Sequence, residues 1–324
     1  MKALRLADSA QKAVLVEQDI PQPKPREGEV LIRVHAAGVT PTELQWYPTS
    51  HTKTGDPRTG AVPSHEFSGE IAELGGGVAG VSIGEEIYGM NDWFAEGALA
   101  EYCITSPDWI APKPRRLSHA EAASVPIGAL TAWQGLFIRA KLQPGERVLV
   151  HGAAGAVGVF AVQLARSRGV YVVATVSARN FEFVKSLGAN QVIDYKAVPF
   201  EKEAPDIDVV FDGVGGDTLR RSWSILKPHG RLVTIAADSE AASDERTKQA
   251  FLIVEPNREQ LIAIQRMLDA GDLRPMVDKV LPLSQAPAAF AGTVERSGRG
   301  KLVVAIVEPQ GARAQEAGPG HSAQ

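Results

Sequence analysis

The chain has 324 residues, of which 44% are hydrophobic and 22% are charged, enough for two domains that each bury a core. The formal net charge is −4 and Lys and Arg form no run, so nucleic acid is not an expected partner. No stretch approaches the roughly 18 apolar residues of a membrane span, and the N-terminus carries no apolar signal segment, so we expect no membrane partner and a cytoplasmic location.

The first third of the chain consists of short alternating segments that are broken by glycine and proline. These segments lie at residues 2–6, 13–20, 29–39, 66–75 and 85–90. Alternation of apolar and polar residues with a period of two, bounded by turn residues, is typical of a β-barrel or β-sandwich. We therefore predict a β-rich domain over residues 1–122.

From about Ser118 the pattern changes to strands that alternate with helices. Apolar runs lie at residues 147–152, 171–176, 191–195, 208–216 and 231–236, with helices from Ala156, from Arg179 and through Leu226 between them. Such a series of βαβ units predicts an α/β domain with a parallel, doubly wound sheet, over residues 123–270.

The last part of the chain is predicted to return to the first domain. An amphipathic helix at 258–271 is followed by two β-rich segments, at 277–283 and 300–307, so residues 271–308 are assigned to the β-rich domain. From Glu308 onward large apolar residues are almost absent, which predicts a disordered tail over 309–324.

The sharpest motif is the glycine-rich turn VLVHGAAGAVG, with Gly152, Gly155 and Gly158 between an apolar strand and a helix. A pyrophosphate group needs bare backbone N–H groups and a helix N-terminus close by, and side chains would hold it off. Compared with the pattern G-x-G-x-x-G, Ala153 takes the first glycine position. A plain tight turn is the alternative, but the strand–turn–helix context favours a dinucleotide site.

The end of the next strand distinguishes NADPH from NADH. An acidic residue there would accept hydrogen bonds from the adenosine ribose, but Ser177, Ala178 and Arg179 follow the strand instead. A hydroxyl, a guanidinium and the start of a helix suit a 2′-phosphate, so NADPH is the expected cofactor. The alternative is that Ser177 only caps the helix while Arg179 is solvated.

Several motifs together resemble the medium-chain dehydrogenase/reductase superfamily, in its zinc-lacking quinone oxidoreductase branch. They are HAAGVTPTEL at His35, VPSHEFSGEIAELG at Val62, ALTAWQGL at Ala129, HGAAGAVG at His151, SARNFEFVKSLGANQVIDY at Ser177 and GRGKLVVAI at Gly298. The resemblance implies a GroES-like catalytic domain, a Rossmann domain, a cleft between them and a homodimer.

The resemblance also implies site residues. It places Thr131 near the nicotinamide. It implies pyrophosphate contacts at Gly155, Ala156, Val157 and Gly158, adenosine phosphate contacts at Ser177, Arg179 and Tyr195, nicotinamide ribose contacts at Gly213 and Val214, and further cofactor contacts at Ala236, Phe251 to Ile253, Gly300 and Lys301.

Zinc-dependent relatives hold their metal with cysteine, histidine and a third ligand. Here Thr40 occupies the first ligand position, the single cysteine is Cys103, and only His65 with Glu66 remains of the metal-binding pattern. A catalytic zinc is therefore not expected, and His65 is predicted to be hydrogen-bonded. Without a Lewis acid, an unactivated ketone has no partner for its developing alkoxide, which disfavours an alcohol dehydrogenase.

Reduction of a quinone or an α,β-unsaturated carbonyl compound does not need a Lewis acid, because conjugation spreads the incoming negative charge onto an oxygen that hydrogen bonds can stabilise. This small, electrophilic molecule is the expected partner. Thr40 stands where many relatives carry asparagine and can still hydrogen-bond. Tyr47 is the candidate proton donor, although Trp46 and Tyr47 could instead form only a pocket wall. The alternatives are a zinc-type alcohol dehydrogenase, an enoyl-thioester reductase and a non-catalytic NADPH-binding sensor.

Overall fold

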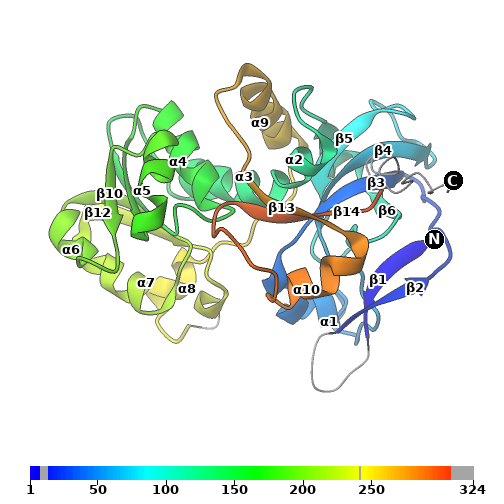
Figure 1. The fold of residues 1–324 in the computed structure, drawn as a ribbon, viewed down its shortest axis with the longest axis horizontal. Coiled ribbons are helices and arrows are strands. Elements are labelled where there is room, and N and C mark those ends of the chain that lie inside the picture. The colour runs from blue at the N-terminus through cyan, green and yellow to red at the C-terminus, as the bar shows by residue number, and fades with distance from the viewer. Residues whose placement is uncertain (8–13, 241, 308–324) are drawn as a thin grey trace, which may run out of the picture.

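The computed structural model describes residues 1–7, 14–240 and 242–307, and the predicted tail at 309–324 lies outside them. Two lobes, each organised around a sheet, lie side by side (Figure 1). Within the described ranges, no helix combines the length and the apolar character needed to cross a membrane.

The first lobe is built on a mixed sheet that has seven strands among the described residues. Its order is β13-β14-β3-β4-β5-β7, and β6 pairs with β3. The short antiparallel pair β1 and β2 lies beside it (Figure 1). The strands are β1 (Lys2–Leu6), β2 (Leu15–Asp19), β3 (Val30–Gly38), β4 (Glu66–Leu74), β5 (Glu86–Met90), β6 (Tyr102–Thr105), β7 (Ile110–Pro112), β13 (Val277–Pro282) and β14 (Lys301–Ala305).

The end of the described chain joins this first sheet. Strand β14 pairs antiparallel with β3 through Val303, Val304 and Ala305, and β13 pairs parallel with β14. The apolar run from Leu302 to Val304 is buried, and removing these side chains from water favours the pairing of this strand with the sheet. Strand β14 therefore lies next to β3, and β13 one strand further out, although more than 200 positions separate them from β3 in the chain.

The second lobe contains a sheet of five strands within the described chain, all parallel, in the order β10-β9-β8-β11-β12. They are β8 (Arg147–His151), β9 (Tyr171–Val176), β10 (Gln191–Asp194), β11 (Ile207–Asp212) and β12 (Leu226–Thr234). Apolar runs such as Val148–Val150 are fully buried because helices cover both faces. The predicted α/β class, with a β-rich and a doubly wound part, is confirmed; the domain boundaries stay a prediction.

The helices are short, and the one that follows β8 begins later than predicted. It starts at Gly158, not Ala156, because residues 152–157 form the turn. The helices are α1 (Tyr47–Ser50), α2 (His119–Ala123), α3 (Pro126–Trp133), α4 (Gly158–Ser167), α5 (Phe181–Ser186), α6 (Phe200–Glu203), α7 (Gly216–Ser222), α8 (Glu245–Ala250), α9 (Arg258–Ala270) and α10 (Ala286–Phe290).

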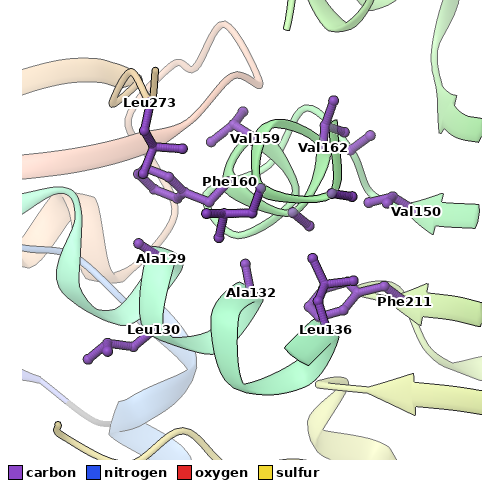
Figure 2. Packing of buried hydrophobic residues seen from close by; sticks show 14 of the residues in the cluster. Ala129, Leu130, Ala132, Leu136, Val150, Val159, Phe160, Val162, Phe211 and Leu273 are labelled. Atoms are coloured by element: carbon purple, nitrogen blue, oxygen red, sulfur yellow. The ribbon is translucent and has the colours of Figure 1, made fainter. Parts of the chain in front are cut away.

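One continuous hydrophobic core connects the lobes. Figure 2 shows Ala129 and Ala132 pointing from α3 toward α4, whose Phe160 points back at them. Small side chains on α3 let the two helices approach closely. Two buried hydrogen bonds reinforce the junction: Tyr88 Oη donates to Leu261 O at 2.6 Å, and Trp93 Nε1 donates to Val254 O at 2.9 Å. The lobes are thus held in a fixed arrangement by packing and polar contacts.

Candidate functional site

A groove opens at the carboxyl ends of the parallel strands. Strand β8 is followed in the chain by β9 on one side, whereas β11 lies on its other side, so the strand order reverses at β8. Ligands of doubly wound sheets bind at such a switch point. The groove has a volume of about 480 Å³ and is lined by His151, Gly152, Ala154, Gly155, Thr175, Val176, Ser177, Arg179, Asn180, Tyr195, Phe200, Gly213, Val214, Thr218, Arg221 and Gly298.

The glycine-rich turn leaves the backbone bare at this groove. Gly152 has a φ of 71°, in the left-handed region that favours glycine. A Cβ atom on Gly158 would lie 2.2 Å from the carbonyl oxygen of Gly152, so no side chain fits there. The turn ends at the N-terminus of the ten-residue helix α4, whose dipole favours an anion, although the Val159 and Phe160 N–H groups already donate to Gly155 O and Val157 O. This cradle fits the pyrophosphate of a dinucleotide.

The adenosine end of the groove follows β9. Ser177, Arg179 and Tyr195 all line it, and no carboxylate does among the residues that the structure describes. The Ser177 hydroxyl does not cap the turn that follows it, so capping does not account for this serine. Arg221 is paired with Glu201 at 2.5 Å, whereas Arg179 has no ion pair in the described part of the chain. Of the two arginines that line the groove, Arg179 is thus the one whose charge is available for an anion.

A buried carboxylate forms the floor beneath Gly213 and Val214. Asp212, the last residue of β11, accepts hydrogen bonds from the backbone N–H of Val214 at 3.1 Å and of Gly215 at 3.0 Å. The Thr234 hydroxyl also donates to it, at 2.8 Å. Burial raises the pKa of Asp212, against the lowering effect of these donors. Asp212 was not predicted as a site residue, although a carboxylate at the end of an apolar strand indicates a polar contact at that edge of the sheet.

His151, the last residue of β8, was also missed. The Ser222 hydroxyl donates to Thr218 O, so its oxygen accepts from His151 Nε2, at 3.0 Å. His151 Nδ1 is then the acceptor for the Thr175 hydroxyl, at 2.8 Å. Burial lowers the pKa of His151 to about 4, so the ring is neutral at pH 7. His151 is thus a neutral histidine that lines the groove and has both ring nitrogens hydrogen-bonded.

A second polar cluster lies where the first lobe meets the glycine-rich turn. The Gly300 N–H donates to Ala154 O at 2.9 Å, which brings the start of β14 against the turn. The next side chain, Lys301, is buried, and its ammonium binds the Glu66 carboxylate and the Thr40 hydroxyl, the latter at 3.2 Å. Glu66 Oε2 also accepts from the Ile127 N–H at the start of α3, at 2.9 Å.

This cluster determines what the Thr40 hydroxyl can do. An ammonium group only donates hydrogen bonds, so the Thr40 oxygen accepts from Lys301 and keeps its own hydrogen available for another acceptor. Glu66 compensates the Lys301 charge, and burial raises the Glu66 pKa against the opposing effect of Lys301. Lys301, predicted as a cofactor contact, does not line the cofactor groove; its ammonium lies beside Thr40.

The other two predicted catalytic residues lie in different settings. Thr131, one turn after Ile127 on α3, is buried and donates its hydroxyl hydrogen to Ile127 O at 2.6 Å, so only its oxygen lone pairs remain. Tyr47 is 55% exposed and its ring stacks on His51, with centroids 4.3 Å apart. Among the described residues no hydrogen bond joins Tyr47 to the cluster at Thr40. Its role as proton donor stays a prediction.

His65, the histidine of the predicted metal-binding pattern, is held by close polar contacts. His65 Nδ1 lies 2.6 Å from Glu43 Oε2, and His65 Nε2 lies 3.2 Å from Ala95 O. Both ring nitrogens thus face oxygen acceptors. No group of three potential metal ligands occurs in the described ranges. Cys103 lies in β6 with its side chain buried, and burial raises the pKa of its thiol.

The remaining predicted cofactor residues do not line the groove. Ala156 and Val157 belong to the glycine-rich turn, and Gly158 begins α4. Ala236 follows β12, and Phe251 bridges to Thr234 at the end of the same strand. Ile253 is 48% exposed on the segment after Phe251. Sequence reasoning did not name the lining residues Ala154, Thr175, Thr218 and Arg221.

Comparison with known proteins agrees with this architecture. Residues 26–115 match the alcohol dehydrogenase GroES-like domain, and residues 187–304 match the zinc-binding dehydrogenase family. The mitochondrial NAD(P)H oxidoreductase RTN4IP1 of Danio rerio is 30% identical, over 87% of this chain and 84% of that protein. The 2-methylene-furan-3-one reductase of Solanum lycopersicum is 32% identical, over 94% of this chain and 79% of that protein.

Among solved structures, the quinone oxidoreductase from Coxiella burnetii is similar, with a TM-score of 0.84 and 32% identity. The match covers 95% of this chain and 99% of that one. The strand order of the two sheets and the glycine-rich turn point to the same family as these similarities. The chain belongs to the medium-chain dehydrogenase/reductase superfamily, in its quinone oxidoreductase branch.

Proposed function

We propose that this oxidoreductase uses NADPH to reduce a quinone or an α,β-unsaturated carbonyl compound, without a zinc ion. A nicotinamide cofactor follows from the family, and the observation that carries the choice of NADPH is the adenosine end of the groove. Arg179 has no ion pair among the described residues, and the Ser177 hydroxyl does not cap the following turn. No described carboxylate lines the groove, where it would repel a 2′-phosphate. A guanidinium binds a phosphate through charge-assisted hydrogen bonds.

The donor set at the catalytic end supports a reaction without zinc. A thiolate ligand is absent from the first metal position, which holds Thr40, and the single cysteine of the chain is buried in β6. Both ring nitrogens of His65 face oxygen acceptors, on Glu43 and Ala95, so neither nitrogen is directed at an open coordination position. These residues fit a hydrogen-bonded cluster better than a catalytic zinc site.

The chemistry then depends on how the chain holds a developing negative charge. When bound, NADPH supplies a hydride from C4 of its nicotinamide to the electron-poor carbon of the acceptor. The two electrons of the hydride leave negative charge on the conjugated oxygen, and Thr40 can stabilise it by donating its available hydrogen. Lys301 keeps the Thr40 hydroxyl in this donor orientation. One proton completes the reduction to the saturated carbonyl compound or hydroquinone.

The experiment that tests this function uses the purified chain, treated with a chelator and analysed for residual metal. NADPH and NADH are titrated by fluorescence, and consumption of NADPH is followed with 1,4-benzoquinone, 9,10-phenanthrenequinone, a short enone and crotonyl-CoA. Turnover of a quinone or the enone is the expected result. Turnover of crotonyl-CoA alone would indicate an enoyl-thioester reductase, binding without turnover would indicate a sensor, and activity restored only by zinc would indicate a metal-dependent dehydrogenase.

We also propose that the enzyme works as a homodimer in the cytoplasm. Size-exclusion chromatography with light scattering tests the dimer, and fractionation of the source cells tests the location. A monomeric enzyme with full activity would contradict the first of these proposals.

A further inference from the structure

We propose that Arg299 is a second cation of the 2′-phosphate site and that, with Arg179, it sets the selectivity for NADPH over NADH. This inference rests on the proposed use of NADPH. It assigns a specificity role to a residue that lies outside the nucleotide-binding sheet, on the segment that leads into β14 of the other lobe.

The segment 296–300 packs against the turn that follows β9. Arg299 Nε donates to Asn180 Oδ1 at 2.9 Å, and Arg299 Nη2 donates to the backbone carbonyl of Arg179 at 3.1 Å. Its guanidinium also lies over the Phe183 ring, 4.8 Å from the centroid. Asn180 itself is only 5% exposed. Arg299 is therefore held on the same turn that carries Ser177 and Arg179.

Gly298 places Arg299, which does not itself line the groove, beside the end of the groove that Arg179 lines. It lines the groove and has a φ of 79°, which favours glycine. A Cβ atom on Gly298 would lie 2.6 Å from Arg179 Nη2, so the Arg179 guanidinium rests directly on the backbone of this glycine. Arg299 is the next residue in the chain. A larger residue at 298 would be strained at this φ and would force the end of the Arg179 side chain to shift.

The charges at this end are uncompensated. Two neighbouring arginines are paired with carboxylates, Arg221 with Glu201 and Arg296 with Asp278. Neither Arg179 nor Arg299 has such a partner in the part of the chain that the structure describes. A guanidinium has five N–H donors, and the two hydrogen bonds of Arg299 leave others available. A 2′-phosphate bound at this end would give both guanidinium groups an anionic partner.

The 2′-phosphate is the group by which NADPH differs from NADH, so the test compares affinities for the two. Wild type, R299A, R299K and R179A are titrated with each cofactor by fluorescence. Loss of a charge-assisted contact predicts that R299A weakens NADPH binding roughly 10-fold or more, with NADH affinity changed less than about twofold. R299K, which keeps the charge, should bind NADPH more tightly than R299A does.

The matched control is R296A, which removes an arginine of the same segment that is already paired with Asp278. Its ratio of NADPH to NADH affinity should equal that of wild type. Equal losses for both cofactors in R299A, or no loss for either, would overturn the inference and leave Arg299 as a structural brace. The titration needs no acceptor, so its result is independent of whether the chain turns over a quinone. Wild-type protein without preference for NADPH would refute the proposed cofactor itself.

Discussion

At the scale of single residues, the neighbours of Thr40 determine the direction of its hydrogen bonds. Lys301 can only donate to it, and Glu66 holds Lys301 in place, so the direction of the hydrogen bond follows from the chemistry of an ammonium group. The sequence resemblance implies a metal ligand at this position in zinc-dependent relatives. We propose that here a hydroxyl backed by a buried cation polarises the substrate oxygen instead.

Replacement of Thr40 tests that assignment. Thr40→Val keeps the shape but removes the donor, and we expect kcat to fall roughly 10- to 100-fold, in the range found for single transition-state donors. NADPH affinity should not change, because Thr40 lies outside the cofactor groove. Thr40→Ser is the matched control and should keep most of the activity. Stopped-flow measurement of NADPH oxidation gives both rates, and full activity of T40V would contradict the role.

His151 makes stability depend on pH. Burial lowers its pKa to about 4 in the folded chain, below the ordinary value near 6.5. The unfolded chain therefore binds a proton more readily. The contribution of His151 to stability is fully present above about pH 6.5, and it is lost as the pH falls toward 4.

His151→Gln removes this titration and keeps a side chain that can hydrogen-bond. Between pH 7 and pH 4, wild type should lose about 3 kcal/mol more free energy of unfolding than the variant does. Urea unfolding at several pH values measures the difference. Parallel curves for the two proteins over this range would mean that His151 is not held neutral by the fold.

At the scale of elements, we propose that the unit of β8, the glycine-rich turn and α4 positions the cofactor. Gly158→Ala would force its Cβ against the Gly152 carbonyl, so the turn must open and its N–H groups must move. We expect NADPH affinity to drop at least about 10-fold, as for the loss of a hydrogen bond to a charged group. Gly76→Ala is the control, because a Cβ there meets nothing within 4 Å. Unchanged affinity in G158A, measured by fluorescence titration, would contradict the pyrophosphate assignment.

Most helices and strands could be predicted from the sequence, because the residue patterns that indicate them lie within one short segment. Apolar runs in 147–152 and 208–216 gave the buried strands β8 and β11, and the glycine spacing gave the turn between β8 and α4. The contacts of Lys301 with Glu66 and of Arg299 with Asn180 were not predictable, since each joins residues more than 100 positions apart. A pattern within one segment contains no information about which distant side chain will meet it. His151 and Asp212 were visible as polar strand ends, but their hydrogen-bond partners were not.

At the scale of the whole molecule, the chain crosses between the lobes more than once. Strands β13 and β14 belong to the first sheet (Figure 1), while Gly298 lines the groove of the second lobe and Arg299 donates to Asn180 beside it. The cofactor groove is therefore completed by both lobes. A ligand bound there should stabilise the entire fold and not the nucleotide-binding lobe alone.

Thermal unfolding tests this coupling. A concentration of NADPH 100-fold above its Kd should raise the free energy of unfolding by about 2.7 kcal/mol in a single transition. NADH at the same concentration should stabilise the protein less, because it lacks the 2′-phosphate. Calorimetry with each cofactor measures both effects. Two separate transitions, only one of which responds to NADPH, would contradict the view that both lobes complete the site.

The most direct test of the central claim is the initial rate at which the metal-free, purified chain oxidises NADPH in the presence of 9,10-phenanthrenequinone. The account predicts catalytic turnover that a chelator does not reduce, with a higher kcat/KM for NADPH than for NADH. Absence of turnover with this quinone and with a short enone, or activity that appears only after zinc is added, would contradict it.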